Sequence, residues 1–174
     1  MRSLNALRAV VLSFGAAYLI FSQDHSVAVG LFILQVVTVA LVVGAIGFQR
    51  IPKLKATIKD IFTPSVIALA VAVLSLVVVG EQDLFQFKAL VILLVVAMAV
   101  FEFVLSTKAE SGEKIELRIS ATLGALTGLL FLFAPLNDLN AVGFFSAYLA
   151  ISAVQRAVWA SGPSKGKKST NGKN

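Results

Sequence analysis

The sequence contains no cysteine, one histidine and few charged residues, and each shortage excludes a class of protein. Without cysteine, the 174 residues cannot form disulfides, cysteine nucleophiles or thiolate metal sites. The single histidine, His25, excludes a His-rich metal cluster within one chain. Charged residues make up 14% of the chain, whereas about 25% is usual for a soluble domain. So few polar residues cannot cover the surface of a water-soluble fold.

Long apolar runs take the place of the missing charges. Hydrophobic residues make up 58% of the chain, and the runs show no strict apolar/polar alternation, which argues against a transmembrane barrel. Helices are the remaining way to satisfy the backbone in lipid, and about 20 residues are enough to cross it. We therefore expect an all-α polytopic membrane protein with six transmembrane helices, over about residues 4–21, 27–48, 62–80, 88–106, 118–135 and 141–160.

The basic residues of the loops fall almost entirely on one side of these spans. That side carries 14 of the 15 Lys and Arg residues, and the other side carries Lys88 alone among acidic turns. Because loops rich in Lys and Arg stay in the cytoplasm, both termini are predicted to be cytoplasmic. Residues 161–174 are predicted to form a disordered basic tail. The first span is expected to be retained, because no A-x-A cleavage pattern occurs near Ser22.

The spans show a period of about 55 residues. Leu7-Arg8 and Leu117-Arg118 open the first and fifth spans 110 residues apart, and acidic outer turns follow roughly half that spacing. A fixed period predicts repeated units, here three tandem helical hairpins of the same orientation around an axis near the membrane normal. The alternative is that any six-span protein with short loops shows similar spacing.

The third hairpin carries a recognisable pattern over Arg118–Ala160. A short helix with two glycines ends at a proline, and a longer helix with an early glycine follows; the residues are Gly124, Gly128, Pro135, Gly143, Tyr148 and Ile151. This pattern resembles the repeated hairpin of the HdeD-like acid-resistance membrane protein family. The resemblance implies a bacterial inner-membrane protein linked to envelope stress tolerance, with no catalytic residues.

Two polar residues inside the spans are candidate functional groups. Glu102 is the one acidic residue within an apolar run, and it is expected either to reach water or pair with Lys108 or Arg156, or to serve as a relay or substrate site. Gln35 lies near the middle of the second span, where it is expected to hydrogen-bond across helices or to line a pore. Its candidate partners are Ser75, Thr127 and Tyr148.

Small residues recur every four positions along the fifth span, at Ser120, Gly124 and Gly128. Such a stripe lets another helix approach closely. Ser146 and Ala150 offer a similar stripe on the sixth span. Both stripes are expected to pack inside the chain, and a homodimer face is the alternative.

Two basic segments are predicted to contact anionic lipid headgroups. After Pro52, apolar residues at helical spacing predict a short interfacial helix, with a solvated basic loop as the alternative. The tail carries further lysines without aromatic residues, which disfavours nucleic-acid binding. The predicted headgroup contacts are Lys53, Lys55, Lys59, Lys165, Lys167 and Lys168.

The sequence contains no enzymatic or cofactor-binding motif. We therefore expect a non-enzymatic membrane protein without cofactors, accessory or stress-related, which acts through lipid and helix contacts with itself or a larger membrane protein. The alternative is a small-solute channel or transporter lined by Gln35, Tyr148 and Glu102. His25, in an outer turn, is either a pH-sensitive group or an ordinary solvated histidine.

Overall fold

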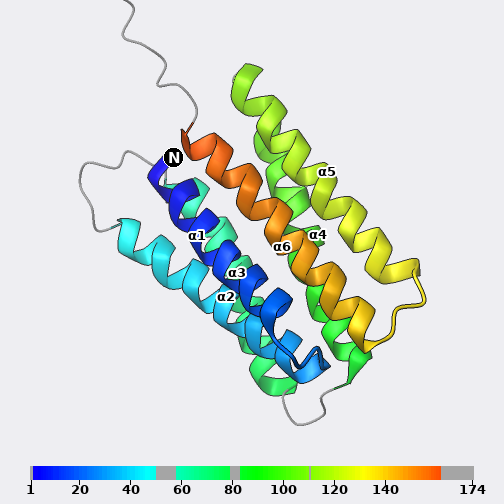
Figure 1. The fold of residues 1–174 in the computed structure, drawn as a ribbon. Helices are drawn as coiled ribbons and strands as arrows, with labels where there is room; N and C mark the ends of the chain where they lie inside the picture. The colour runs from blue at the N-terminus through cyan, green and yellow to red at the C-terminus, as the bar shows by residue number, and fades with distance from the viewer. Residues whose placement is uncertain (1, 50–57, 79–82, 110, 162–174) are drawn as a thin grey trace, which may run out of the picture.

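The computed structural model is an all-helical bundle that describes residues 2–49, 58–78, 83–109 and 111–161. Its helices run antiparallel to their chain neighbours, and the N-terminus lies at the same end as the last turn of α6 (Figure 1). We call this the terminal end and the opposite one the turn end. The helices are α1 (Arg2–Phe21), α2 (Val27–Gln49), α3 (Ile58–Val78), α4 (Leu84–Ser106), α5 (Ser111–Phe133) and α6 (Asp138–Ser161).

The surface of the bundle is apolar. Phe14, Phe85 and Phe133 are 73%, 75% and 75% exposed, and large aliphatic side chains are exposed on all six helices. Exposed apolar surface on this scale marks contact with a membrane or a partner. Four helices are long and apolar enough to cross a membrane, namely α2, α4, α5 and α6. Over the described residues, α1 and α3 contain shorter apolar stretches, Asn5–Phe21 and Pro64–Leu76.

Three helices begin four or more residues earlier than the sequence predicts, and α4 is one of them, since it starts at Leu84 and not near residue 88. Helix α5 starts at Ser111, not near residue 118, because a helix does not have to stop where its apolar stretch stops. Glu113 in its first turn also interacts favourably with the helix dipole. Helix α3 starts at Ile58 and continues through Pro64, so residues 58–62 belong to α3 and not to a separate interfacial helix.

The helices α2, α4 and α6 begin with the same local structure at the turn end. The amides of Gly30, Phe87 and Ala141 each donate to the carbonyl four residues earlier, at 3.1, 3.1 and 2.9 Å. Before α4 and α6, the side chains of Asp83 and Asn137 accept N–H groups of the first turn, at Phe85 and Asn140, which the helix start leaves unpaired. Before α2, Asp24 accepts the N–H of Ser26, the residue that precedes the helix.

These three starts bring the same helix positions to a common centre. The residues four and eight positions after Gly30, Phe87 and Ala141 are all at most 1% exposed. They are Leu34, Thr38, Val91, Val95, Phe145 and Leu149. Because a spacing of four keeps residues on one helix face, α2, α4 and α6 each present the same face to the centre. We call these three the inner helices.

Each of the other helices packs in a groove between two inner helices. Helix α1 contacts α6 and α2, α3 contacts α2 and α4, and α5 contacts α4 and α6. The more extensive contact is with α6 for α1, with α2 for α3 and with α4 for α5. We call α1, α3 and α5 the outer helices. Each outer helix packs less closely on the inner helix of its own hairpin than on that of another hairpin.

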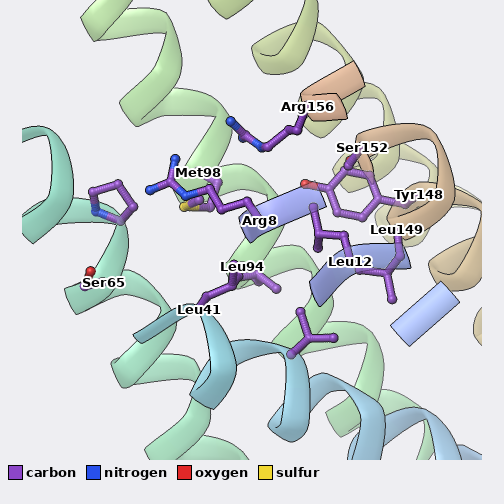
Figure 2. A pocket seen from close by; sticks show the side chains of 12 residues that line it. Arg8, Leu12, Leu41, Ser65, Leu94, Met98, Tyr148, Leu149, Ser152 and Arg156 are labelled. Atoms are coloured by element: carbon purple, nitrogen blue, oxygen red, sulfur yellow. The ribbon is translucent and has the colours of Figure 1, made fainter. Parts of the chain in front are cut away.

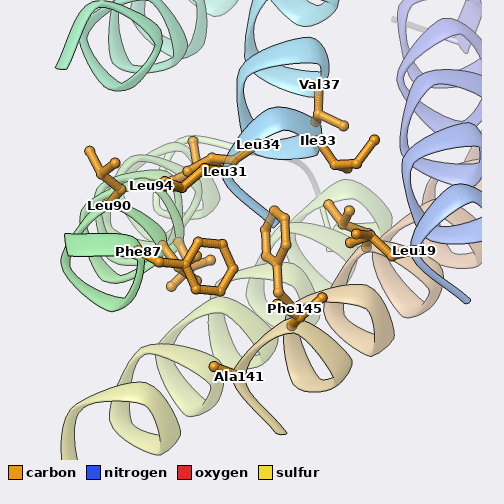
Figure 3. Close-up of a cluster of buried hydrophobic side chains, with 14 of the residues drawn as sticks. Leu19, Leu31, Ile33, Leu34, Val37, Phe87, Leu90, Leu94, Ala141 and Phe145 are labelled. Carbon is orange, nitrogen blue, oxygen red and sulfur yellow. The ribbon is translucent and has the colours of Figure 1, made fainter. Parts of the chain in front are cut away.

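Aromatic side chains fill the turn-end half of the centre (Figure 3). The rings of Phe131 and Phe145 pack edge-on against Phe87, with centroids 6.4 and 5.7 Å away. Gly30 allows this packing, since a Cβ there would lie 3.0 Å from both the Phe87 ring and a methyl of Val142. We call Phe87, Phe131 and Phe145 the aromatic core.

Replacing Gly30 by leucine tests this packing. We expect Gly30→Leu to lower the free energy of unfolding by about 1–3 kcal/mol, the usual cost of an overpacked core. The control is Gly143→Leu on α6, where a Cβ meets nothing within 4 Å. Denaturant unfolding in a mild detergent measures both, and equal midpoints for the two variants would contradict the arrangement.

Candidate functional site

A buried ion pair joins two inner helices near the terminal end. Arg156 of α6 donates a hydrogen bond to the carboxylate of Glu102 on α4, and the two residues are 8% and 5% exposed. Arg156 is one of the two partners that the sequence offers for Glu102. The other, Lys108, is exposed beyond the end of α4. Glu102 is therefore satisfied inside the protein and does not reach out to water.

The register of the inner helices explains why these two residues meet. Glu102 lies 15 residues after Phe87, and Arg156 lies 15 residues after Ala141. Since Phe87 and Ala141 occupy the same place in their helices, the two charges reach the same height. A carboxylate and a guanidinium at equivalent positions of two contacting helices can then pair directly.

Further polar groups gather around this pair. Arg8 of α1 lies close enough to interact electrostatically with both Glu102 and Arg156. The side chains of Tyr148 and Ser152, one turn apart on α6, face the same space as Arg156. Sequence reasoning counts Arg8 only as a cytoplasmic charge, because its contribution to the site depends on where α1 packs.

These residues border a cavity of about 40 Å³ between five helices (Figure 2). A water molecule needs roughly 10–15 Å³ on this measure, so the cavity holds a few small groups. Its apolar floor faces the aromatic core, and its polar wall faces the terminal end. The lining residues are Arg8, Leu12, Val37, Leu41, Pro64, Ser65, Leu94, Met98, Tyr148, Leu149, Ser152 and Arg156.

Gln35 lies apart from this cavity. Its amide nitrogen donates to the backbone carbonyl of Ser75 at 3.2 Å, which ties α2 to α3. Ser75 is one of its three expected partners, although the acceptor is the backbone, since the Ser75 hydroxyl donates to Ala72. Of the three residues expected to line a channel, Tyr148 lines the cavity and Glu102 pairs with Arg156, which also lines it. Gln35 neither lines the cavity nor contacts this pair.

The two stripes of small residues face other helices of the same chain. A Cβ at Gly124 would lie 2.9 Å from the carbonyl oxygen of Val95, and one at Gly128 would lie 2.6 Å from a methyl of Val96, so both glycines face α4. Ser120, one turn earlier, is half-buried. On α6, Ser146 donates to the Ala16 carbonyl of α1 at 3.4 Å, and Ala150 is half-buried. The glycines and Ser146 thus pack inside the chain.

The predicted headgroup contacts lie largely outside the described residues. Lys59 belongs to the first turn of α3. Lys53, Lys55, Lys165, Lys167 and Lys168 fall in 50–57 and 162–174, which the structure does not describe. His25 is half-buried and lies in the turn in which the Asp24 carboxylate accepts the N–H of Ser26.

Lys88, at the turn end, has a structural role. Its ammonium donates to the Ala134 carbonyl at the end of α5, at 3.4 Å. A cation at a helix C-terminus satisfies an unpaired carbonyl and interacts favourably with the dipole.

Comparisons with family models, with curated proteins and with solved structures find no match. The site is therefore interpreted from its own chemistry. Among the residues that the structure describes, no three His, Cys, Asp or Glu side chains are grouped to hold a metal ion. The cavity instead presents two guanidinium groups and three hydroxyls, which can donate hydrogen bonds to water or to an anion.

The ion pair can be tested by removing one charge. Glu102→Gln leaves Arg156 buried without a carboxylate, and we expect a loss of about 3–5 kcal/mol in the free energy of unfolding. Replacing both residues with Glu102→Leu/Arg156→Met should recover most of that loss, because no uncompensated charge remains.

Glu113→Gln is the matched control, since Glu113 is exposed on α5. It should change the free energy of unfolding by less than about 0.5 kcal/mol. Denaturant unfolding of the four proteins in one detergent makes the comparison. A double variant that is less stable than Glu102→Gln would show that the pair is not the origin of the effect.

Proposed function

We propose that the protein crosses the cytoplasmic membrane six times as three tandem hairpins, with both termini in the cytoplasm. The threefold pattern of contacts supports the hairpin repeat, because each unit contributes one inner and one outer helix in the same way. The matching register of the three inner helices supports it independently. The terminal end, where Lys and Arg predominate, is then the cytoplasmic end.

The packing of α1 and α3 supports six spans. These helices have 20 and 21 residues, about 30 Å at 1.5 Å per residue, which matches the hydrocarbon thickness. Each lies between two helices that are apolar enough to cross the membrane. We expect a helix that packs between two spans to cross the membrane with them.

The same proposal gives the protein a non-enzymatic role, accessory or in envelope stress tolerance, through helix and lipid contacts. The observation that carries it is the filled centre: the aromatic core closes the turn-end half, and Glu102 is engaged by Arg156. Membership of the HdeD-like family is part of the proposal, on the pattern over Arg118–Ala160.

A small-solute channel or transporter is the second candidate, favoured by the polar cavity between the hairpins. The cavity opens a polar space only in the terminal-end half, where Arg8, Tyr148 and Ser152 lie. A solute would still have to pass the aromatic core, so conduction requires α2, α4 and α6 to separate at the turn end.

The topology can be tested by cysteine labelling, because the natural chain has no cysteine. We expect Gln23→Cys, exposed in the first turn, to react with a membrane-impermeant maleimide in intact cells. Lys108→Cys, exposed after α4, should react only after the membrane is opened. The reverse pattern would contradict the orientation, and labelling of both sites in intact cells would contradict the span count.

The accessory role and the channel role differ in two measurements. An accessory protein should co-purify in mild detergent with itself or with another membrane protein, and liposomes that contain it should leak solutes no faster than empty ones. Flux that Tyr148→Phe alters while the helix content stays unchanged would favour the channel. A partnerless monomer would count against the accessory role.

A further inference from the structure

The cavity at the terminal end carries more positive charge than its surroundings neutralise. Arg8 and Arg156 both line it, and no carboxylate appears among its lining residues. Glu102, behind the wall, already accepts a hydrogen bond from Arg156. Among the residues that the structure describes, the three groups therefore leave one net positive charge inside the bundle.

A charge removed from water is tolerated when it is paired and its donors are satisfied. Arg8 is half-buried, and Arg156 is buried against Glu102. Each guanidinium offers five N–H donors and no acceptor. To the residues that the structure describes, the two guanidinium groups donate one hydrogen bond, from Arg156 to Glu102. An anion in the cavity would remove both the charge imbalance and part of the donor surplus.

Polar side chains reach the cavity from three helices. Figure 2 shows the guanidinium groups of Arg8 and Arg156 on the same side of it, with the Tyr148 hydroxyl facing the cavity from α6. Met98 and Leu94 of α4 add apolar surface, and Met98 lies beside Arg8. Hydrogen-bond donors set among apolar side chains favour a compact ligand that accepts hydrogen bonds.

The volume limits the ligand further. A cavity of about 40 Å³ accepts a few water-sized groups, which favours a small, compact ligand over a bulky one. We propose that the cavity binds one small monovalent anion, such as chloride, nitrate or formate, held between Arg8 and Arg156 and reached from the terminal end. The site needs only the described packing and does not depend on an accessory role or on transport.

The test measures thermal unfolding of the full chain, purified in an uncharged detergent with gluconate as the only anion. Gluconate is too large for the cavity and keeps the ionic strength constant. We expect chloride, nitrate and formate each to raise the unfolding midpoint in a saturable way, because a ligand that binds only the folded state stabilises it. Equilibrium dialysis with radioactive chloride should saturate at one ion per chain.

The variants assign the site. Arg8→Gln should weaken chloride binding at least about tenfold, the loss expected for a charge-assisted hydrogen bond. Arg8→Lys keeps the charge and should bind more tightly than Arg8→Gln. The control, Arg118→Gln, removes an exposed arginine of α5 and should bind as the natural protein does. If Arg8→Gln loses its helix content, Tyr148→Phe provides a milder change that should weaken binding in the folded protein.

Three outcomes would overturn the proposal. One is a midpoint that does not respond to small anions, and another is binding that Arg8→Gln leaves unchanged. The third concerns Asp60, four residues before Pro64 in α3, whose side chain is not described. Chloride binding that appears only in Asp60→Asn would show that a carboxylate of the chain occupies the site.

Anionic lipid is the remaining source of a negative group. Phosphatidylglycerol is added to the detergent in the gluconate buffer, without chloride. We expect it to leave the midpoint almost unchanged, because a phosphodiester with its glycerol body is much bulkier than the few water-sized groups that the cavity accepts. Stabilisation by this lipid but not by chloride would identify a headgroup phosphate as the occupant and would overturn the small-anion proposal.

Discussion

The common register of α2, α4 and α6 is the constraint on which the rest of the structure depends. Three capped helix starts at the turn end place equivalent residues at equal height, and the same face of each helix then turns to the centre. Close approach at that end requires a residue without a side chain at Gly30. Once the inner helices are fixed, three grooves remain between them, and α1, α3 and α5 fill those grooves.

The same register determines the chemistry of the centre. Glu102 and Arg156 occupy equivalent positions on two helices, so their pairing needs no special loop or bend. Pairing satisfies both charges where the packing removes them from most of the surrounding water. The third inner helix contributes no charge to the pair, and Arg8 approaches from α1 instead. The local excess of positive charge therefore comes from the outer layer of the bundle.

Hydropathy predicts the six helices well because apolar runs and helices nearly coincide in a membrane protein. It misplaces the starts of α3, α4 and α5, where the helix extends beyond its apolar run. The sequence limits the partners of Gln35 and Glu102 to a few residues. It cannot identify the actual partner, because that depends on how α2 packs against α3 and how α4 packs against α6. The role of Arg8 is not predicted at all, because counting charges along the sequence treats every basic residue near the end of a span as a loop residue.

The two halves of the bundle differ in polarity along its axis, and this difference limits what the protein can do. Aromatic rings fill the turn-end half, whereas arginines, hydroxyls and a small cavity occupy the terminal-end half. A charged group in the second half stays within one or two helical turns of the helix ends, where it can be hydrated through the cavity. A charged group in the centre of the first half would be surrounded by apolar side chains, Phe87, Phe131 and Phe145 among them. Exchange with the terminal end therefore needs small movements, whereas passage across the bundle needs the inner helices to part where their packing is closest.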